Sequence, residues 1–275
     1  MTWLGKVVGG TFGFLMGGPL GALLGAAFGH QLDRNLDEVE LLESDGAAGV
    51  QYRVQMAFFT ATFSVMGHIA KADGRVSEAE IDAARRVMGR MELPEDLRRT
   101  AIHLYHQGKR ADFPLDAALE QFRQECQKRY ALFRVFIEIQ LEAALADGVL
   151  HRSAEQLLLR ICDRLNFSRF EFYAMRARLE AERRFARHSH RARQRARREP
   201  PTAREPSLAD AYAVLGASAS ASDSDIKRAY RRLMSQHHPD KLAARGVPEE
   251  MLRLATEKTQ QIRRAYDAIA KARKL

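Results

Sequence analysis

The chain has few residues that can form covalent cross-links and lacks the alternating pattern that is typical of β-strands. Its two cysteines among 275 residues, Cys126 and Cys162, lie far apart and match no metal-binding or redox spacing. A pair of reduced thiols in a cytosolic protein core is the expectation for such residues. No stretch alternates apolar and polar residues as a half-buried strand would, and helical periodicity dominates instead. The sequence therefore predicts an all-α protein without disulfides.

Charge is absent from one long stretch near the N-terminus. Residues 7–29 carry no charged side chain, and this run of 23 residues is bounded by Lys6. A bilayer core takes about 20 apolar residues in a helix, so residues 1–31 are expected to form a transmembrane anchor. A cleaved signal peptide fits less well, because the basic flank is one lysine and the apolar run is too long. Lys6 and Arg34 flank the run almost symmetrically, so the positive-inside rule gives no orientation.

Glycine is the unusual component of this anchor, since it recurs at every fourth position from residue 5 to residue 29. Small residues four apart let two transmembrane helices approach closely. The row predicts self-association of the anchor, as a homodimer, through Gly9, Gly13, Gly17, Gly21 and Gly25. Each step of four drifts by about 40° around a helix, so a straight partner meets only about three or four of them. A lone anchor whose glycines meet no partner is the alternative.

Residues 50–185 are predicted to form a helical domain of about seven helices. The stretch 130–146 is apolar over a wide arc, which predicts a central helix that is buried on most sides. Pro94 and Pro114 stand where helices are expected to begin, because proline is tolerated in a first turn.

Two turns of this domain share the sequence Ala-Asp-Gly, at 72–74 and 146–148. A glycine there can close the preceding helix in the left-handed conformation. The caps predicted for the following helices are Ser77 with Glu80 and Ser153 with Gln156. Calcium binding by Asp73 and Asp147 is the alternative, but the residues after them do not supply oxygen ligands at alternating positions. We expect turns and caps here, and no metal.

The excess of positive charge is concentrated in residues 186–207, which hold seven arginines, two glutamates and three prolines. No apolar stripe runs through them, which predicts a solvated linker whose first part continues the preceding helix. Contact with anionic lipid headgroups is the more specific alternative, since a basic residue near a membrane surface contributes about 1 kcal/mol to membrane binding. Nucleic acid is not expected as a partner, because the segment offers no aromatic side chain for stacking on bases.

The last segment, residues 208–275, carries the most specific pattern. Ser222 and Asp225 form a capping signature before a helix that must end near His238, because the residue before a proline avoids helical geometry. The helix carries a basic group, made of Lys227, Arg228, Arg231 and Arg232. Like charges four residues apart repel by a few tenths of a kcal/mol, so this group predicts an acidic partner. A second helix, to about residue 270, returns antiparallel to the first.

His238, Pro239 and Asp240 begin the connection between these two helices and contain the ingredients of a metal or catalytic site. The proline fixes the backbone between the histidine and the aspartate, so their side chains need not converge. Neighbouring residues at a helix end point about 100° apart, which separates His237 from His238. We expect His237 to pack inward and His238 to lie in the loop, with neither catalysis nor a metal at this position and no cofactor.

The whole segment resembles the J domain of the DnaJ family, in LADAYAVLGASASASDSDIKRAYRRLMSQHHPDKL and the later QQIRRAYDAI. His238, Pro239 and Asp240 stand where that family has its signature tripeptide. The resemblance implies a co-chaperone that binds a DnaK-type chaperone and stimulates its ATP hydrolysis without being an enzyme itself. It also implies that the basic group meets an acidic chaperone surface and that the tripeptide engages the groove near the interdomain linker.

The order of the parts resembles the DjlA family of membrane-anchored DnaJ-like proteins of Gram-negative bacteria. The motifs that carry this resemblance are W-x-G-K near the N-terminus, TFSVMGH and FIEIQLEAALADG, and the central domain is similar to TerB-like helical domains. The chain departs from the TerB-like pattern in the second turn, where Ala154 stands seven residues after Asp147. It also lacks the Gly/Phe-rich and cysteine-rich regions of full DnaJ.

The resemblance implies a single-pass protein of the bacterial inner membrane with its C-terminal domains in the cytoplasm. The expected parts are the anchor (1–31), the TerB-like domain (50–185), the linker (186–207) and the J domain (208–275). An alternative function is an envelope-stress or signalling adaptor, whose central domain binds a membrane partner while the J domain is accessory.

The glycine row generates a first prediction. The substitutions Gly17→Ile and Gly21→Ile place branched side chains on the predicted contact line, so they should weaken self-association of the anchor in a membrane reporter assay. Association that stays at the wild-type level would leave the glycine row without a role.

Overall fold

The structure is a computed structural model that describes residues 18–23, 25, 47–72, 78–126, 129–196, 208–245, 247 and 249–275. These residues form helices and turns and contain no strand, which confirms the predicted all-α class. They divide into two compact units, Met1–Arg169 with Ala243–Met251 and Phe170–Leu242 with Leu252–Leu275.

Most of the predicted anchor lies outside the described residues. Gly9, Gly13 and Gly17 fall outside them, whereas Gly21 and Gly25 are included. Within the part of the chain that the structure describes, no helix combines the length and the apolar character that crossing a bilayer requires. The predicted contact between glycine rows therefore stays a prediction.

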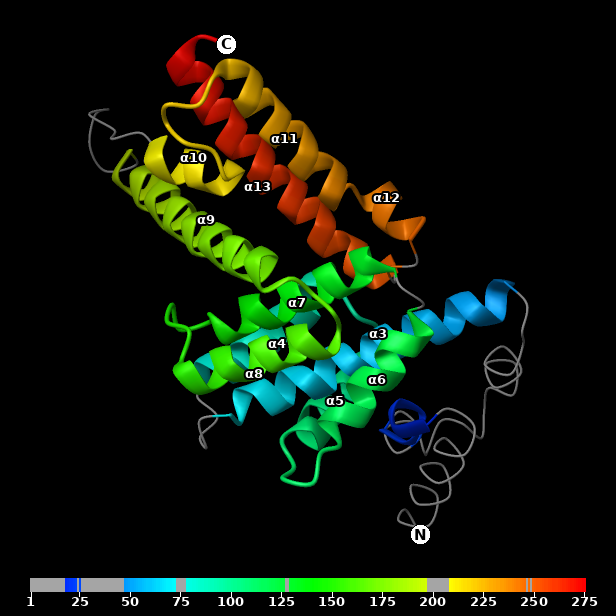
Figure 1. The fold of residues 1–275 in the computed structure, drawn as a ribbon. Helices are drawn as coiled ribbons and strands as arrows, with labels where there is room; N and C mark the ends of the chain where they lie inside the picture. Colours follow the sequence, from blue (N-terminus) through cyan, green and yellow to red (C-terminus); the bar gives the residue numbers. More distant parts are fainter. Residues whose placement is uncertain are drawn as a thin grey trace. The chain divides into compact units, whose positions relative to one another are not determined.

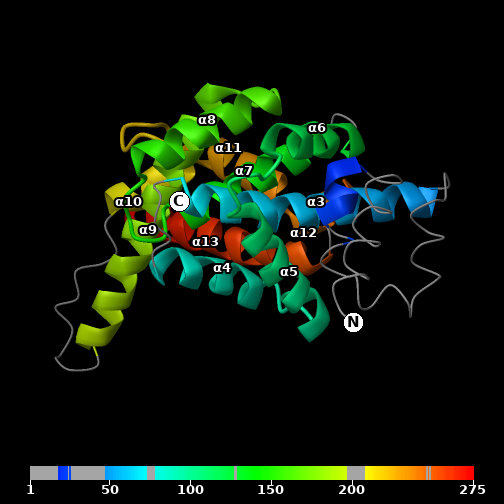
Figure 2. The same cartoon turned by 90° about the horizontal axis from the view of Figure 1, so that it is seen from below.

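The first unit is built around one long helix. Its helices are α3 (Ala47–Ala70), α4 (Glu78–Arg90), α5 (Glu95–Gly108), α6 (Leu115–Glu125), α7 (Tyr130–Ala144) and α8 (Arg152–Arg164). Helix α3 contacts each of the others, and Figure 2 shows it running lengthwise among them. Helix α7 is buried on most sides, as its wide apolar arc predicts. With α9 of the second unit, the described part of residues 47–196 holds seven helices, the predicted number.

The central place of α3 is not evident from its sequence, because Thr60, Thr62 and Ser64 interrupt its apolar pattern. All three are buried. The Ser64 hydroxyl donates to the backbone carbonyl of Thr60 at 2.7 Å, so this polar group is satisfied within the helix. The hydroxyls of Thr60 and Thr62, in contrast, are buried without a hydrogen-bond partner among the described residues.

Two glycines let α5 lie directly against α3. A Cβ atom on Gly67 would stand 2.0 Å from the carbonyl oxygen of Tyr105, and one on Gly108 would stand 1.7 Å from that of Ser64. Both contacts are with backbone, which cannot move aside as a flexible side chain can. The crossing of α3 and α5 therefore excludes any side chain at these two positions.

The structure corrects one predicted cap and confirms one predicted turn. Gly148 has a φ of +99°, the left-handed conformation expected of it. Helix α8, however, begins at Arg152 with His151 at the N-cap, so Ser153 is not the cap. Asp147 orders this turn instead, because its carboxylate accepts hydrogen bonds from the backbone N–H of Val149 at 3.1 Å and pairs with the His151 ring at 3.0 Å. In the other Ala-Asp-Gly turn, Asp73, Gly74 and the predicted cap Ser77 lie outside the described residues.

The two cysteines are free thiols in the core of the first unit. Burial raises the pKa of both, and that of Cys162 to about 12. Both thiols are therefore neutral and poorly reactive at pH 7, as expected for structural cysteines.

The second unit contains α9 (Arg169–Ala196), α10 (Leu208–Leu215), α11 (Asp223–His237), α12 (Pro239–Ala243) and α13 (Glu249–Arg273). Helices α11 and α13 form the predicted antiparallel hairpin, with α12 at the end far from the C-terminus (Figure 1). Helix α9 reaches Ala196, so the first part of the arginine-rich segment continues the preceding helix, as its sequence predicts. Helices α10 and α12 are too short to show a clear helical period, so they were not predicted as separate helices.

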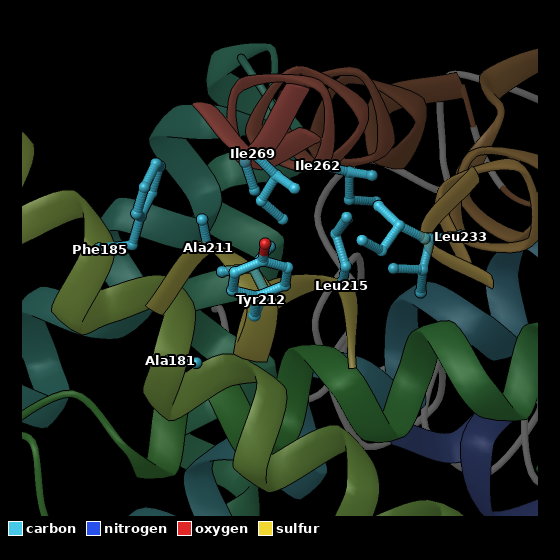
Figure 3. Packing of buried hydrophobic residues seen from close by; sticks show 11 residues of the cluster. Ala181, Phe185, Ala211, Tyr212, Leu215, Leu233, Ile262 and Ile269 are labelled. Atoms are coloured by element: carbon cyan, nitrogen blue, oxygen red, sulfur yellow. The ribbon is translucent and has the colours of Figure 1, made fainter. Parts of the chain in front are cut away.

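The middle of α9 belongs to the same core as the hairpin. Ala181 and Phe185 pack in one cluster with Ala211 and Tyr212 of α10 and Ile269 of α13 (Figure 3). Ala181 is completely buried and Phe185 is 9% exposed. Helix α9 therefore completes the core of the C-terminal domain, which the sequence alone placed in residues 208–275.

A buried ion network holds α9 against α13. The Glu182 carboxylate pairs with the ammonium group of Lys258, and its other oxygen lies 3.5 Å from Nε of Arg178. All three residues are buried. Removing one member of such a group leaves a buried charge without its partner and typically costs about 3–5 kcal/mol. Arg184 adds a half-exposed contact between α9 and α10, with its Nε 3.1 Å from Oδ1 of Asp210.

The packing of α9 against α10 and α13 generates a second prediction. Phe185→Ala should destabilise the second unit by about 3 kcal/mol, because it removes a buried ring from the cluster. Denaturation of the full chain, followed by amide hydrogen exchange in α10 and α13, measures the loss.

The same helix provides the control. Phe170 is 82% exposed, so Phe170→Ala should change stability by no more than about 0.5 kcal/mol. Equal effects of the two substitutions would contradict the docking of α9 through Phe185.

Candidate functional site

The N-terminus of α11 is capped by Ser222, as its sequence predicts. The Ser222 Oγ accepts a hydrogen bond from the backbone N–H of Asp225 at 3.2 Å, and its hydroxyl donates to the Asp225 carboxylate at 2.6 Å. In a complete capping box the acidic side chain would instead reach the backbone N–H of the cap residue. The Asp225 carboxylate binds the serine hydroxyl here, and this pair fixes where α11 begins.

An arginine at the far end of α13 holds the same region from the other side. The Arg273 guanidinium donates to the carbonyl of Ala221 at 2.8 Å and to the Asp223 carboxylate at 2.9 Å, and further to the carbonyl of Ala219 and the hydroxyl of Tyr212. One side chain thus ties together α10, the loop after it and the first residue of α11. No local sequence pattern indicates this role, because all the partners are at least 50 residues away.

Stacked aromatic rings join the two arms of the hairpin. The ring centres of Tyr230 on α11 and Tyr266 on α13 are 4.3 Å apart, and the ring planes are inclined by 20°. Leu233 and Ile262 are buried beside them in the same cluster. Both tyrosines pack against this cluster, so they hold α11 and α13 together.

That outer side carries the basic group. Lys227, Arg228, Arg231 and Arg232 are all exposed. Arg228 pairs with Asp225 at 3.4 Å, and Nε of Arg231 donates to the backbone carbonyl of Lys227 at 3.4 Å. Among the described residues, no acidic side chain other than that of Asp225 neutralises this group. The group is therefore a positively charged surface that is open to an acidic partner.

The tripeptide His238-Pro239-Asp240 joins α11 to a short helix. His238 has extended backbone dihedrals (φ −64°, ψ 125°) and ends α11, and Pro239 is the first residue of α12. The backbone N–H of Leu242 donates to the His238 carbonyl at 3.0 Å, and the Leu242 side chain is 2% exposed. The sequence predicts a loop here, but a helical turn forms, because proline suits the first position of a helix.

The His238 and Asp240 side chains of the tripeptide are displayed at the surface. The His238 side chain is 46% exposed and that of Asp240 is 90% exposed, and His238 Nδ1 lies 3.8 Å from Asp240 Oδ2. This distance is longer than a hydrogen bond. His237 is buried, so the two adjacent histidines separate as predicted. The described residues contain no cluster of three or more metal-ligating side chains. The geometry suits recognition by another protein.

Comparison with known proteins identifies the family. Residues 1–49 match the family described as co-chaperone DjlA transmembrane domain, residues 59–177 match tellurite resistance protein TerB, and residues 210–274 match the DnaJ domain. The chain is 44% identical over 277 residues to the co-chaperone protein DjlA of Coxiella burnetii, with 100% of both chains covered. The chain belongs to the DjlA co-chaperone family.

Other DjlA relatives are similar over nearly their whole length. The protein of Vibrio cholerae is 44% identical over 279 residues, with 97% of each chain covered. That of Pasteurella multocida is 40% identical over 285 residues, with 99% of each covered. No solved structure matches the chain. As a DjlA family member, the chain is a J-domain co-chaperone with a membrane anchor.

The docked part of α9 falls between the recognised domains of the DjlA family. Ala181, Glu182 and Phe185 lie after the TerB match, which ends at residue 177, and before the DnaJ match, which begins at residue 210. The buried Lys258 lies inside the DnaJ match, but a lysine among exposed charges gives no sign of burial. These contacts are therefore visible only in the structure.

The hydrogen bonds of Arg273 generate a third prediction. Arg273→Ala removes its hydrogen bonds to the carbonyls of Ala219 and Ala221 in the loop before α11, so the amides of residues 217–223 should exchange about tenfold faster with solvent. Hydrogen exchange of the full chain, followed by mass spectrometry, measures this. Arg263→Ala removes an exposed arginine from the same helix and should leave these amides unchanged.

Proposed function

We propose that this chain binds a DnaK-type chaperone through α11 and the tripeptide and stimulates its ATP hydrolysis at the cytoplasmic face of the inner membrane. The observation that supports this most is the display of His238, Pro239 and Asp240 directly after an exposed basic helix, on a hairpin held rigid from both ends. Relatives that match along their whole length are co-chaperones by name. The ATP hydrolysis would take place in the partner.

The two parts of the surface have different tasks in this proposal. The basic group of α11 steers the encounter with an acidic chaperone surface, so binding should weaken as salt screens the charges. The tripeptide makes the specific contact. Because Pro239 and the buried Leu242 fix the backbone on both sides of Asp240, little ordering is required on binding, which favours affinity.

The membrane anchor sets where this happens. DnaK-type chaperones are cytosolic, so the J domain has to be on the cytoplasmic side, which makes the protein a single-pass inner-membrane protein with its C-terminal domains in the cytoplasm. Tethering raises the local concentration of the activator at the membrane. If the anchors associate through their glycine row, each pair presents two J domains.

A fourth prediction tests the proposal. The full chain in detergent should stimulate single-turnover ATP hydrolysis by a DnaK-type chaperone, and His238→Gln or Arg231→Glu should reduce the stimulation about thirtyfold, the loss expected when a dominant contact of an interface is removed. Stimulation should also fall as salt is raised, because the encounter is steered by charge.

The control for the charge reversal is Arg263→Glu, which replaces an exposed arginine on α13 and changes the net charge by the same amount. It should leave the stimulation intact. Wild-type stimulation in the His238→Gln chain, or equal losses from Arg231→Glu and Arg263→Glu, would contradict the proposed site.

A further inference from the structure

The arginine-rich end of α9 extends beyond the J core, the buried cluster that α9, α10, α11 and α13 share. Helix α9 continues to Ala196, eleven residues beyond Phe185, the last α9 residue in the J core. Residues 186–196, the end of this helix, hold four arginines and no acidic residue. A helix that carries such an excess of one charge is stable only if the charge meets solvent or an anionic partner.

The arginines in this half of α9 follow a line. Arg184, Arg187, Arg191 and Arg195 are separated by three, four and four residues. At about 100° per residue, these four positions fall within an arc of about 80° around the helix. Arg193 lies about 160° away from Arg191 on the same scale. The spacing therefore places these four positions on one face of α9.

This line lies away from the face by which α9 is docked. Its centre is about 120° around the helix from Phe185, which packs in the J core. The side chain of Arg184, where the line begins, is 53% exposed, although its Nε is 3.1 Å from Oδ1 of Asp210. The line thus starts at the edge of the J core, on a helix whose rotation is fixed by the buried pair of Glu182 and Lys258.

We propose that the line of arginines from Arg184 to Arg195 binds the anionic headgroups of the membrane that holds the anchor, and so fixes the J domain at the membrane surface. The charge is of the right sign, and the match of residues 1–49 to a transmembrane family places the chain at a membrane. The proposal rests on that anchoring and does not depend on binding of a DnaK-type chaperone.

A lipid surface fits this line better than a nucleic acid does. Residues 186–207 contain no tryptophan, tyrosine or phenylalanine, so bases would have no ring to stack on. A basic residue near an anionic surface strengthens binding about fivefold, and several in a row add up to a stable contact. The contact should be sensitive to salt, because it is electrostatic.

The test uses the full chain in lipid nanodiscs, with amide exchange of residues 186–196 as the readout. Discs of phosphatidylcholine with about 30% phosphatidylglycerol should slow this exchange relative to discs of phosphatidylcholine alone, and about 0.5 M salt should remove the difference. Equal exchange in the two kinds of disc would overturn the proposal. Protection in neutral discs by about 10 mM inorganic phosphate or by a single-stranded oligonucleotide would also overturn it, because the ligand would then be a free anion or a nucleic acid.

Two double variants distinguish the effect of the line of arginines from the effect of the overall positive charge of the segment. R187Q/R191Q and R193Q/R197Q each remove two positive charges from the same segment, but only the first removes them from the line. In anionic discs, the first variant should lower the protection of these amides from exchange about twentyfold, and the second less than about threefold. Equal losses would overturn the proposal.

A functional control keeps this proposal separate from the chaperone site. In detergent, where no anionic bilayer is present, the R187Q/R191Q chain should stimulate the chaperone as well as the wild-type chain does. A loss of stimulation there would mean that these arginines serve chaperone binding and would overturn the lipid proposal.

Discussion

The burial of Glu182 between Lys258 and Arg178 is the contact on which the arrangement of the C-terminal unit depends. A carboxylate removed from water needs its partners, because an unpaired buried charge costs several kcal/mol. This requirement fixes both the rotation and the position of α9 against α13. The apolar contacts of Ala181 and Phe185 then supply the area that stabilises the docking. The J core is thus completed by a helix that begins within the TerB-like part of the chain.

The surface that we propose for chaperone binding has no packing of its own, so its order comes from the two ends of α11. At the beginning, Ser222 and Arg273 hold the first turn and the loop before it. At the end, Pro239 and the buried Leu242 hold the turn that displays the tripeptide. Exposed side chains on a fixed backbone bind with little loss of conformational entropy, which is what a recognition site without a pocket requires.

The sequence was most informative where a local rule acts alone. The hairpin, the cap at Ser222 and the separation of His237 from His238 follow from apolar spacing and from one proline. The cap proposed at Ser153 failed because Asp147 orders the same turn through its own hydrogen bonds. The buried Lys258 and the clamp of Arg273 were missed because their partners are far away in the chain, so no local pattern distinguishes them from surface charges. The central position of α3 was hidden by hydroxyl side chains that look polar in the sequence.

The contact between Arg184 and Asp210 has a consequence for the eleven residues, 197–207, that connect α9 to α10. Because the two helices are already held together, the connection is not needed to fix the position of either helix. The entropy of closing a loop grows slowly, by about 0.6 kcal/mol for each doubling of its length. Insertions in this connection should therefore be nearly neutral for folding, which makes it the place where the chain can accept an extra segment, such as a reporter domain, without disturbing the J domain.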